Sequence, residues 1–149
     1  MIYQNEKTNS TASAKQPSLV SVYAQTHAEF LNKVFGTNYK SWMKSTWKYN
    51  DSIDVWMVRF YDCKDDWENR FIDGENVIHE TYVGRSPSRN DFSPKIRVAV
   101  AIEDRGTYRQ YSVKGLYRFI PNESNVRLHV FHRIPDVIAN KFVPKIYNA

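Results

Sequence analysis

The chain has 149 residues, 42% hydrophobic and 25% charged, a balance that excludes disordered, collagen-like and disulfide-scaffold proteins. Its single cysteine, Cys63, excludes an intramolecular disulfide, so we expect a reducing, cytoplasmic location. No stretch approaches the roughly 18 uncharged apolar residues of a membrane span, so we expect no membrane partner. The formal net charge of +5 is spread unevenly, because residues 51–92 hold five basic against ten acidic side chains between two basic ends.

The N-terminal part predicts an arm followed by a helix. Residues 1–16 are rich in polar side chains and predict a flexible N-terminal arm, whereas residues 17–149 predict a single α+β domain. Apolar residues at helical spacing predict a helix that begins at Pro17 and ends before Gly36. A short turn is expected over residues 39–46, with Trp42 and Met43 inward. Lysines 40, 44 and 48 are expected to point outward.

The rest of the chain predicts strands. Asp73-Gly74 is typical of a hairpin turn, and Gly115 is placed where a bulge would bend a long strand. The absence of helical segments between these strands predicts a curled antiparallel sheet of five or six strands, a small barrel or half-barrel, with the N-terminal helix packed on it. The expected strands are 53–61, 70–72, 77–83, 96–102, 108–120 and 126–134.

A basic face on the last strand is the sharpest functional signal. By alternation, Arg127, His129, Phe131 and Arg133 share one face, which is basic and carries an aromatic ring. Such a face binds nucleic acid through phosphate contacts and base stacking, but basic residues also protect the edge of a sheet, and both interpretations stay open. Neighbouring strands and the loop after residue 84 are expected to extend this face with Arg97, Arg109, Lys114, Arg118, Arg85 and Arg89.

Catalysis has no candidate constellation. The acidic residues of the middle segment crowd into expected loops, where solvated charge is the usual interpretation. By parity His129 and His132 lie on opposite faces of one strand, so they do not easily share a metal ion. We therefore expect a protein that is not an enzyme, with no catalytic residues, no metal and no cofactor.

Three stretches together resemble a known class of module. They are residues 30–44, residues 55–60 (Val-Trp-Met-Val-Arg-Phe) and residues 111–119 (Tyr-Ser-Val-Lys-Gly-Leu-Tyr-Arg-Phe). Their order resembles small β-rich modules attached to bacterial restriction and defence proteins, whose barrels are similar to the PUA-like nucleic-acid readers. The resemblance implies nucleic-acid binding without assigning site residues.

Two functions follow from these patterns. The first is a non-enzymatic module that binds DNA or RNA through the basic, aromatic-bearing sheet face. The alternative is a protein-binding module or inhibitor, of phage or mobile-element type, that acts on a nucleic-acid enzyme or defence protein. A homo-oligomer is compatible with either function.

Overall fold

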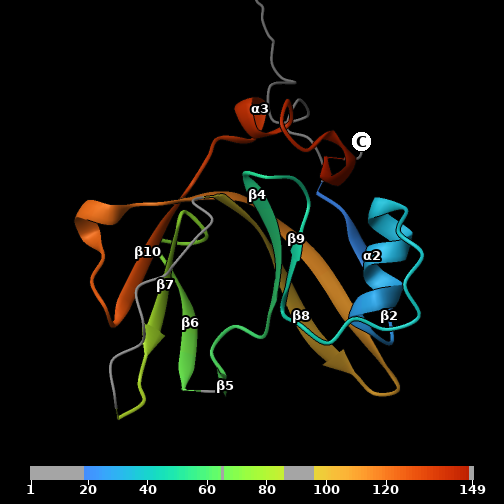
Figure 1. Ribbon diagram of the computed structural model, residues 1–149, viewed down its shortest axis with the longest axis horizontal. Helices are drawn as coiled ribbons and strands as arrows, with labels where there is room; N and C mark the ends of the chain where they lie inside the picture. The colour runs from blue at the N-terminus through green and yellow to red at the C-terminus, as the bar shows by residue number, and fades with distance from the viewer. Residues whose placement is uncertain (1–18, 65, 86–95, 148–149) are drawn as a thin grey trace, which may run out of the picture.

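A computed structural model describes residues 19–64, 66–85 and 96–147 (Figure 1). The predicted arm over residues 1–16 and the predicted contact residue Arg89 lie outside the described residues. Within the described part, no helix is long and apolar enough to span a membrane.

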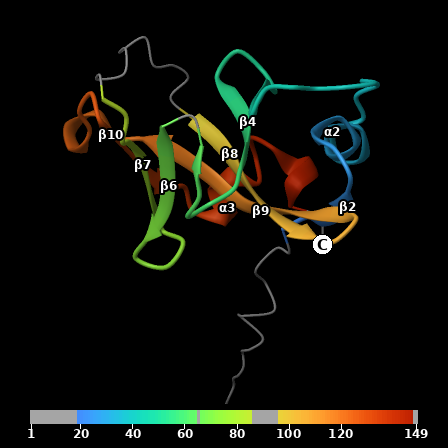
Figure 2. The same ribbon diagram turned by 90° about the horizontal axis from the view of Figure 1, so that it is seen from below.

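A single strongly bent sheet dominates the structure. Figures 1 and 2 show β6 and β7 on one side of the bend and β4 and β8 on the other. The described strands pair in the order β3-β4-β8-β9-β10-β7-β6-β5, and β2 pairs with β9 outside this path. The strands are β2 (Ser21–Ala24), β3 (Thr46–Lys48), β4 (Ile53–Val58), β5 (Cys63–Lys64), β6 (Trp67–Ile72), β7 (Val77–Tyr82), β8 (Ile96–Arg105), β9 (Tyr108–Phe119) and β10 (Leu128–Arg133).

The sheet-rich α+β class is confirmed, but the strand count and the pairing differ from the prediction. The sheet has nine described strands instead of five or six, because β2, β3 and β5 were missed. Strands as short as β3 and β5 carry too few residues for a two-residue period to show. The sheet is also not wholly antiparallel, since β4 pairs with β8 in parallel. The two ends of the described path, β3 and β5, do not pair, so the barrel is open.

The predicted helix is much shorter than expected. Helix α2 spans His27–Phe35, begins where the Thr26 side chain accepts a hydrogen bond from the Glu29 amide, and ends at Gly36 as predicted. The residues before it form β2 instead, because pairing with β9 satisfies their backbone groups. Tertiary pairing here prevails over an apolar spacing that also fits a helix. The short elements near the C-terminus are η2 (Pro121–Glu123), α3 (Asp136–Ala139) and η3 (Pro144–Ile146).

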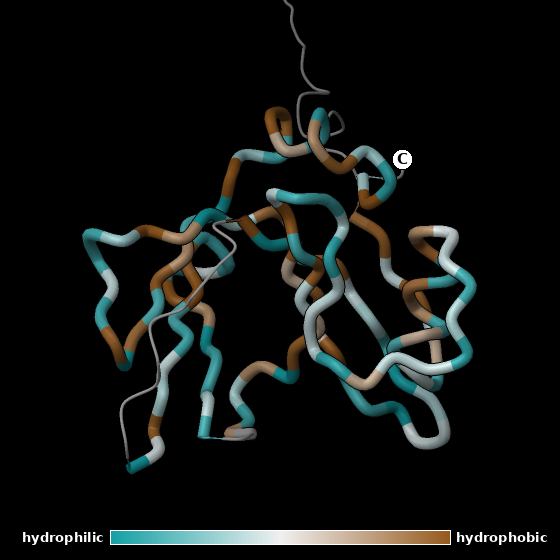
Figure 3. The backbone as a smooth tube through the Cα atoms, viewed as in Figure 1, coloured by the Kyte–Doolittle hydropathy of each residue, from teal (hydrophilic) through white to brown (hydrophobic). Residues whose placement is uncertain are grey.

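Two apolar clusters fill the two sides of the central strands. One lies between α2 and the sheet and includes Phe30, Leu31 and Val98, and the other lies inside the bend. Figure 3 shows the matching hydrophobic colour along the middle of the sheet. The middle of β8 is therefore buried on both faces, since Val98 packs on the α2 side and Ala99 packs inside the bend. The cluster inside the bend consists of Trp56, Val58, Ile78, Ala99, Tyr117 and Phe131.

The bulge predicted at Gly115 is confirmed. The register between β8 and β9 shifts at Ala99/Val100, opposite Gly115, whose φ of 141° is a conformation that only glycine adopts readily. The shift reverses the alternation along β9, so Val113 faces α2 while Tyr117 faces the inside of the bend. The bulge therefore produces the bend that the sheet needs.

Replacing Gly115 by alanine should destabilise the fold. The added Cβ would lie 2.9 Å from the guanidinium carbon of Arg133, which is itself held by Asp136, and the backbone would be strained. We expect a loss of about 3 kcal/mol or more in the free energy of unfolding, measured by urea denaturation. Gly106→Ala is the matched control, since its φ is also positive but nothing lies near its added Cβ. Equal losses for the two variants would contradict the clash.

Candidate functional site

The predicted basic face exists as a face but is not an open surface. Arg97, His129 and Phe131 do share one side of the sheet, yet their exposed fractions are only 8%, 5% and 0%. This side is the inside of the bend, where neighbouring aromatic rings cover it. The prediction that Phe131 stacks on a base and that Arg97 meets a phosphate from an open sheet is therefore wrong in its geometry.

Arg127, just before β10, and Arg133, at the end of β10, both contact other groups of the protein. Arg127 donates to the backbone carbonyls of Tyr82, Gly84 and Arg85, so it fastens the segment after β7. Arg133 forms a two-pronged contact of 2.9 and 3.1 Å with Asp136 and donates to the hydroxyl of Tyr117. Burial raises the pKa of Tyr117 to about 12, although Arg133 acts against this rise.

The remaining predicted cations are scattered. Arg109 contacts Asp104 and the Tyr111 hydroxyl, and Lys114 pairs with Glu75 at 3.1 Å. The bulge turns Arg118 to the opposite face of the sheet, where it is exposed. Arg85 is exposed at the end of a described segment. Contacts of Arg118 and Arg85 with nucleic acid stay predictions.

Removing Arg127 should loosen the segment after β7 without unfolding the domain. Arg127→Ala leaves three backbone carbonyls without their donor, so we expect faster amide hydrogen exchange in residues 82–85. Arg118→Ala, at an exposed site, should leave that exchange unchanged. Unchanged amide exchange of residues 82–85 in Arg127→Ala would contradict this role. Arg127 would then count among the exposed cations.

A cavity of about 750 Å³ opens beside this packed interior, a size typical of small-molecule sites. Its buried lining comes from four strands and includes Trp56 on β4, Asn69 on β6 and Glu80 on β7. Its outer part is exposed and includes Met43 and Lys44, so the expectation that Met43 points inward is wrong. The other lining residues are His27, Ser45, Thr46, Met57, Val58, Arg59, Asp62, Cys63, Trp67 and Ile102.

Polar groups at the bottom of the cavity form a row across three strands. Asn69, Glu80 and His129 occupy directly paired positions on β6, β7 and β10, so their side chains lie on the same face. His129 Nδ1 lies 2.9 Å from Glu80 Oε1, and Arg97 Nη1 lies 3.7 Å from Glu80 Oε2. The Glu80 carboxylate is therefore held on both oxygens, by two groups that do not line the cavity.

Asn69 holds hydrogen-bonding capacity that the protein does not use. Its side-chain oxygen is buried and has no hydrogen-bond partner among the described residues. An unsatisfied buried acceptor costs about 1–3 kcal/mol, and native proteins keep few of them. Because Asn69 also lines the cavity, this oxygen is available to a donor group on a ligand.

Aromatic rings fix the walls of the cavity. Trp67 packs against Tyr82 and His129, with ring centroids 5.1 and 5.2 Å apart. Trp56 packs against Phe131 at 5.5 Å, so the ring first proposed to stack on a base supports a ring that lines the cavity. The site thus combines flat apolar walls with a carboxylate and an amide, a set that suits a planar ring bearing polar edges.

Sequence reasoning missed these four residues, Trp56, Trp67, Asn69 and Glu80, although one signal was present. Ile78, Glu80 and Tyr82 share the inward parity of a strand, and a carboxylate at such a position is uncommon unless it is paired or functional. Among the described residues, no cluster of three or more His, Cys, Asp or Glu side chains is arranged to hold a metal ion.

Comparison with known proteins assigns the fold to a family. A sequence-family model, that of the SET and RING associated (SRA) domain, matches residues 21–139. The chain therefore belongs to the SRA domain family, a class of DNA-binding modules. This confirms the nucleic-acid-binding class and the PUA-like β-rich fold at the level of the family.

A solved structure with a similar fold is described as "The 5-Hydroxymethylcytosine-Specific Restriction Enzyme AbaSI". The TM-score is 0.60, with 21% sequence identity over 77% of this chain. The chain spans 39% of the length of that enzyme, so the likeness concerns one part of it. A search of curated proteins finds no match.

Proposed function

We propose that this chain reads a modified cytosine in DNA by accepting the base, turned out of the duplex, into the cavity bounded by Trp56, Trp67, Asn69 and Glu80. The observation that carries the proposal is the unsatisfied Asn69 oxygen next to a fixed carboxylate at the bottom of that cavity. Proteins that act on a flipped base stack it between apolar rings and read its hydrogen-bonding edge, and these side chains supply both kinds of contact.

The polar groups favour cytosine over thymine. Cytosine carries an amino group that donates hydrogen bonds, which a carboxylate such as Glu80 accepts, whereas thymine carries a carbonyl at that position. The amide of Asn69 adds an acceptor and a donor for the rest of the base edge. A 5-hydroxymethyl group brings a further donor, and the likeness to a 5-hydroxymethylcytosine-specific enzyme makes that base the first to test.

Truncating Asn69 should reduce the preference for the modified base. Wild-type protein should bind a duplex with one 5-hydroxymethylcytosine more tightly than the same duplex with cytosine, as measured by fluorescence anisotropy. Asn69→Ala should weaken binding to the modified duplex by about tenfold, because a lost base contact is worth roughly 1–3 kcal/mol, and should weaken binding to the unmodified duplex less, because that base enters the cavity less often. Asn122→Ala, the same substitution at an exposed position of η2, should change neither affinity.

Two outcomes of this experiment would contradict the proposal. A wild-type protein that does not distinguish modified from unmodified duplexes is not a reader of modified cytosine. We propose further that the chain binds without cleaving, so the DNA should be recovered intact after incubation with Mg²⁺ or Mn²⁺. Cleavage that a chelator abolishes would show an enzyme instead.

The segment between α2 and β3 supports an approach by duplex DNA. Met43 is 90% exposed at the outer part of the cavity, an unusual position for an apolar side chain, and Lys44 lies beside it. Proteins that open base stacks insert methionine and other apolar side chains between base steps while nearby cations contact the phosphates. We therefore propose that the Met43 side chain fills the gap that the displaced base leaves in the duplex.

Met43→Ala should weaken binding to duplex DNA more than to single-stranded DNA of the same sequence, since only the duplex has a stack to open. We expect a loss of roughly tenfold for the modified duplex, since unstacking one step costs a few kcal/mol. Fluorescence of 2-aminopurine next to the modified base reports the opening directly. Ile138→Ala, at an exposed apolar position on α3, should have no effect. Equal losses on both substrates would count against the assignment.

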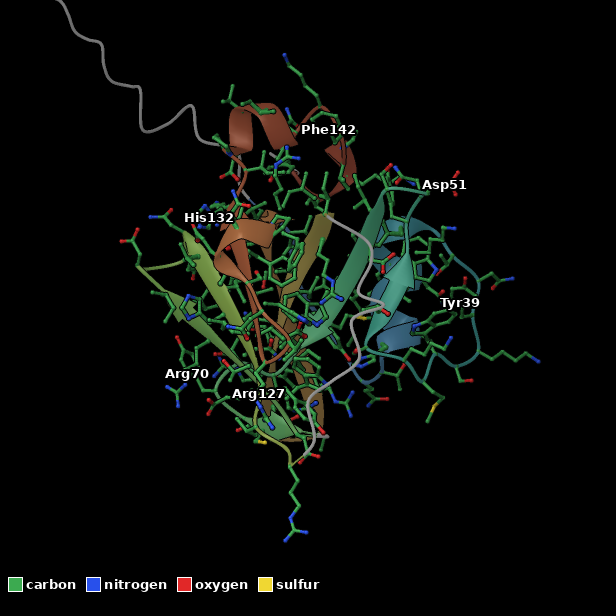
Figure 4. The ribbon with its side chains drawn as sticks, turned by 60° about the vertical axis from the view of Figure 1, so that its left-hand side comes forward. Tyr39, Asp51, Arg70, Arg127, His132 and Phe142 are labelled. Carbon is green, nitrogen blue, oxygen red and sulfur yellow. The ribbon has the colours of Figure 1, made fainter. Side chains whose placement is uncertain are left out.

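A protein partner remains the alternative function, and one surface supports it. Val137, Ile138 and Phe142 are exposed apolar side chains on and just after α3. Figure 4 shows Phe142 at the opposite end of the molecule from Arg70 and Arg127. If neither modified nor unmodified DNA binds, this apolar surface becomes the site to examine.

A further inference from the structure

Arg97 connects two walls of the cavity without lining it. Its Nη1 lies 3.7 Å from Glu80 Oε2, and its guanidinium carbon lies 4.7 Å from the centroid of the Trp56 ring and 5.4 Å from that of Phe131. Glu80 and Trp56 both line the cavity, whereas Arg97 sits behind them. A change at Arg97 therefore reaches the ligand only through residues that touch it.

Burying this cation is costly. Desolvation lowers the pKa of Arg97, and Glu80 and Asp54 act against that effect. Burial likewise raises the pKa of Asp54, the residue directly across from Arg97 in the β4–β8 pair. Replacing a buried ion pair by apolar side chains often stabilises a protein, so fold stability alone does not explain this arrangement.

We propose that Arg97 is a positioning residue that keeps the Glu80 carboxylate ionised and oriented, and thereby sets the preference of the cavity for a base with an amino group over one with a carbonyl. This inference rests on the proposed function, because it concerns how the same cavity chooses its base. Arg97 has no contact with the base itself.

The reasoning depends on which hydrogen bonds each form of Glu80 makes. An ionised carboxylate only accepts, so it pairs with the amino group of cytosine and repels the carbonyl of uracil or thymine. A neutral carboxyl group also donates, so it tolerates both bases. Without a nearby cation, a carboxylate buried this deeply takes up a proton instead of remaining charged.

Other charged or titratable groups around the pair are few among the described residues. His129 faces the other Glu80 oxygen, with its Nδ1 2.9 Å from Oε1, so it contacts the carboxylate independently of Arg97. The charge of Asp54, on β4, raises the pKa of Arg97, and the charge of Lys48 lowers the pKa of Asp54. Arg97 is therefore the permanent positive charge closest to the carboxylate in this set.

The test compares two bases that share the 5-hydroxymethyl group and differ in the hydrogen-bonding groups at ring positions 3 and 4. One duplex carries 5-hydroxymethylcytosine and the other 5-hydroxymethyluracil, each opposite an abasic site so that base-pair strength does not contribute. Binding of wild-type protein, Arg97→Met and Arg97→Lys is measured by anisotropy at about pH 6 and about pH 8. Methionine keeps an unbranched, apolar side chain in place of the cation, and lysine keeps the charge.

We expect the wild-type protein to prefer 5-hydroxymethylcytosine at both pH values. Arg97→Met should reduce this preference by about tenfold, largely through tighter binding of 5-hydroxymethyluracil. Arg97→Lys should retain most of the preference. An equal loss for both bases, or an unchanged ratio in Arg97→Met, would overturn the proposal.

A second measurement covers the case in which Arg97→Met does not fold. The carboxyl carbon of Glu80 in the wild-type protein, followed by ¹³C nuclear magnetic resonance, should keep the chemical shift of an ionised group across the same pH range. A protonation step within that range would overturn the inference. If the wild-type protein shows no preference for 5-hydroxymethylcytosine over cytosine, the proposed function fails instead, and the Glu80 signal still reports on the ion pair.

Discussion

The bend of the sheet is the constraint on which everything else depends. A flat sheet would leave one side of β8, β9 and β10 to solvent, but here that side closes on itself and must be filled. Rings fill most of it, and the backbone bulge opposite Gly115 provides the curvature. What remains at the open edge, between β4, β5 and β6, is a cavity whose aromatic walls are packed against Phe131 and His129. A preorganised site of this kind loses little conformational entropy when a ligand enters.

Polar groups inside the bend form two layers, one that lines the cavity and one behind it. Asn69 and Glu80 reach the cavity, while His129 and Arg97 lie behind them and hold Glu80 in place. Such a buried network is tolerable only when its members have partners, and the Asn69 oxygen has no hydrogen-bond partner within the part of the chain that the structure describes. An unpaired buried acceptor lowers the stability of the fold, and natural proteins accept such losses of stability mainly at functional sites.

Much of the fold could be predicted from local pattern, because it depends on short-range signals. The hairpin at Asp73-Gly74, the end of α2 at Gly36 and the bulge at Gly115 each follow from the conformational freedom of one glycine. The site could not be predicted in the same way. Alternation correctly grouped Arg97, His129 and Phe131 on one face, but alternation does not reveal whether a face meets solvent or another part of the same sheet. That answer depends on curvature and on pairs of strands distant in the sequence.

The parallel pairing of β4 with β8 has a consequence for how the molecule assembles. The two strands are neighbours in the sheet, yet the chain between them makes the whole β5–β6–β7 excursion, which carries Asn69 and Glu80, before it returns. Closing so long a loop is entropically expensive, so this contact forms late compared with the hairpins. Trp56 and Arg97 meet across that late contact. The cavity is therefore complete only in the finished fold, and no partly folded intermediate lacking the β4–β8 contact would possess it.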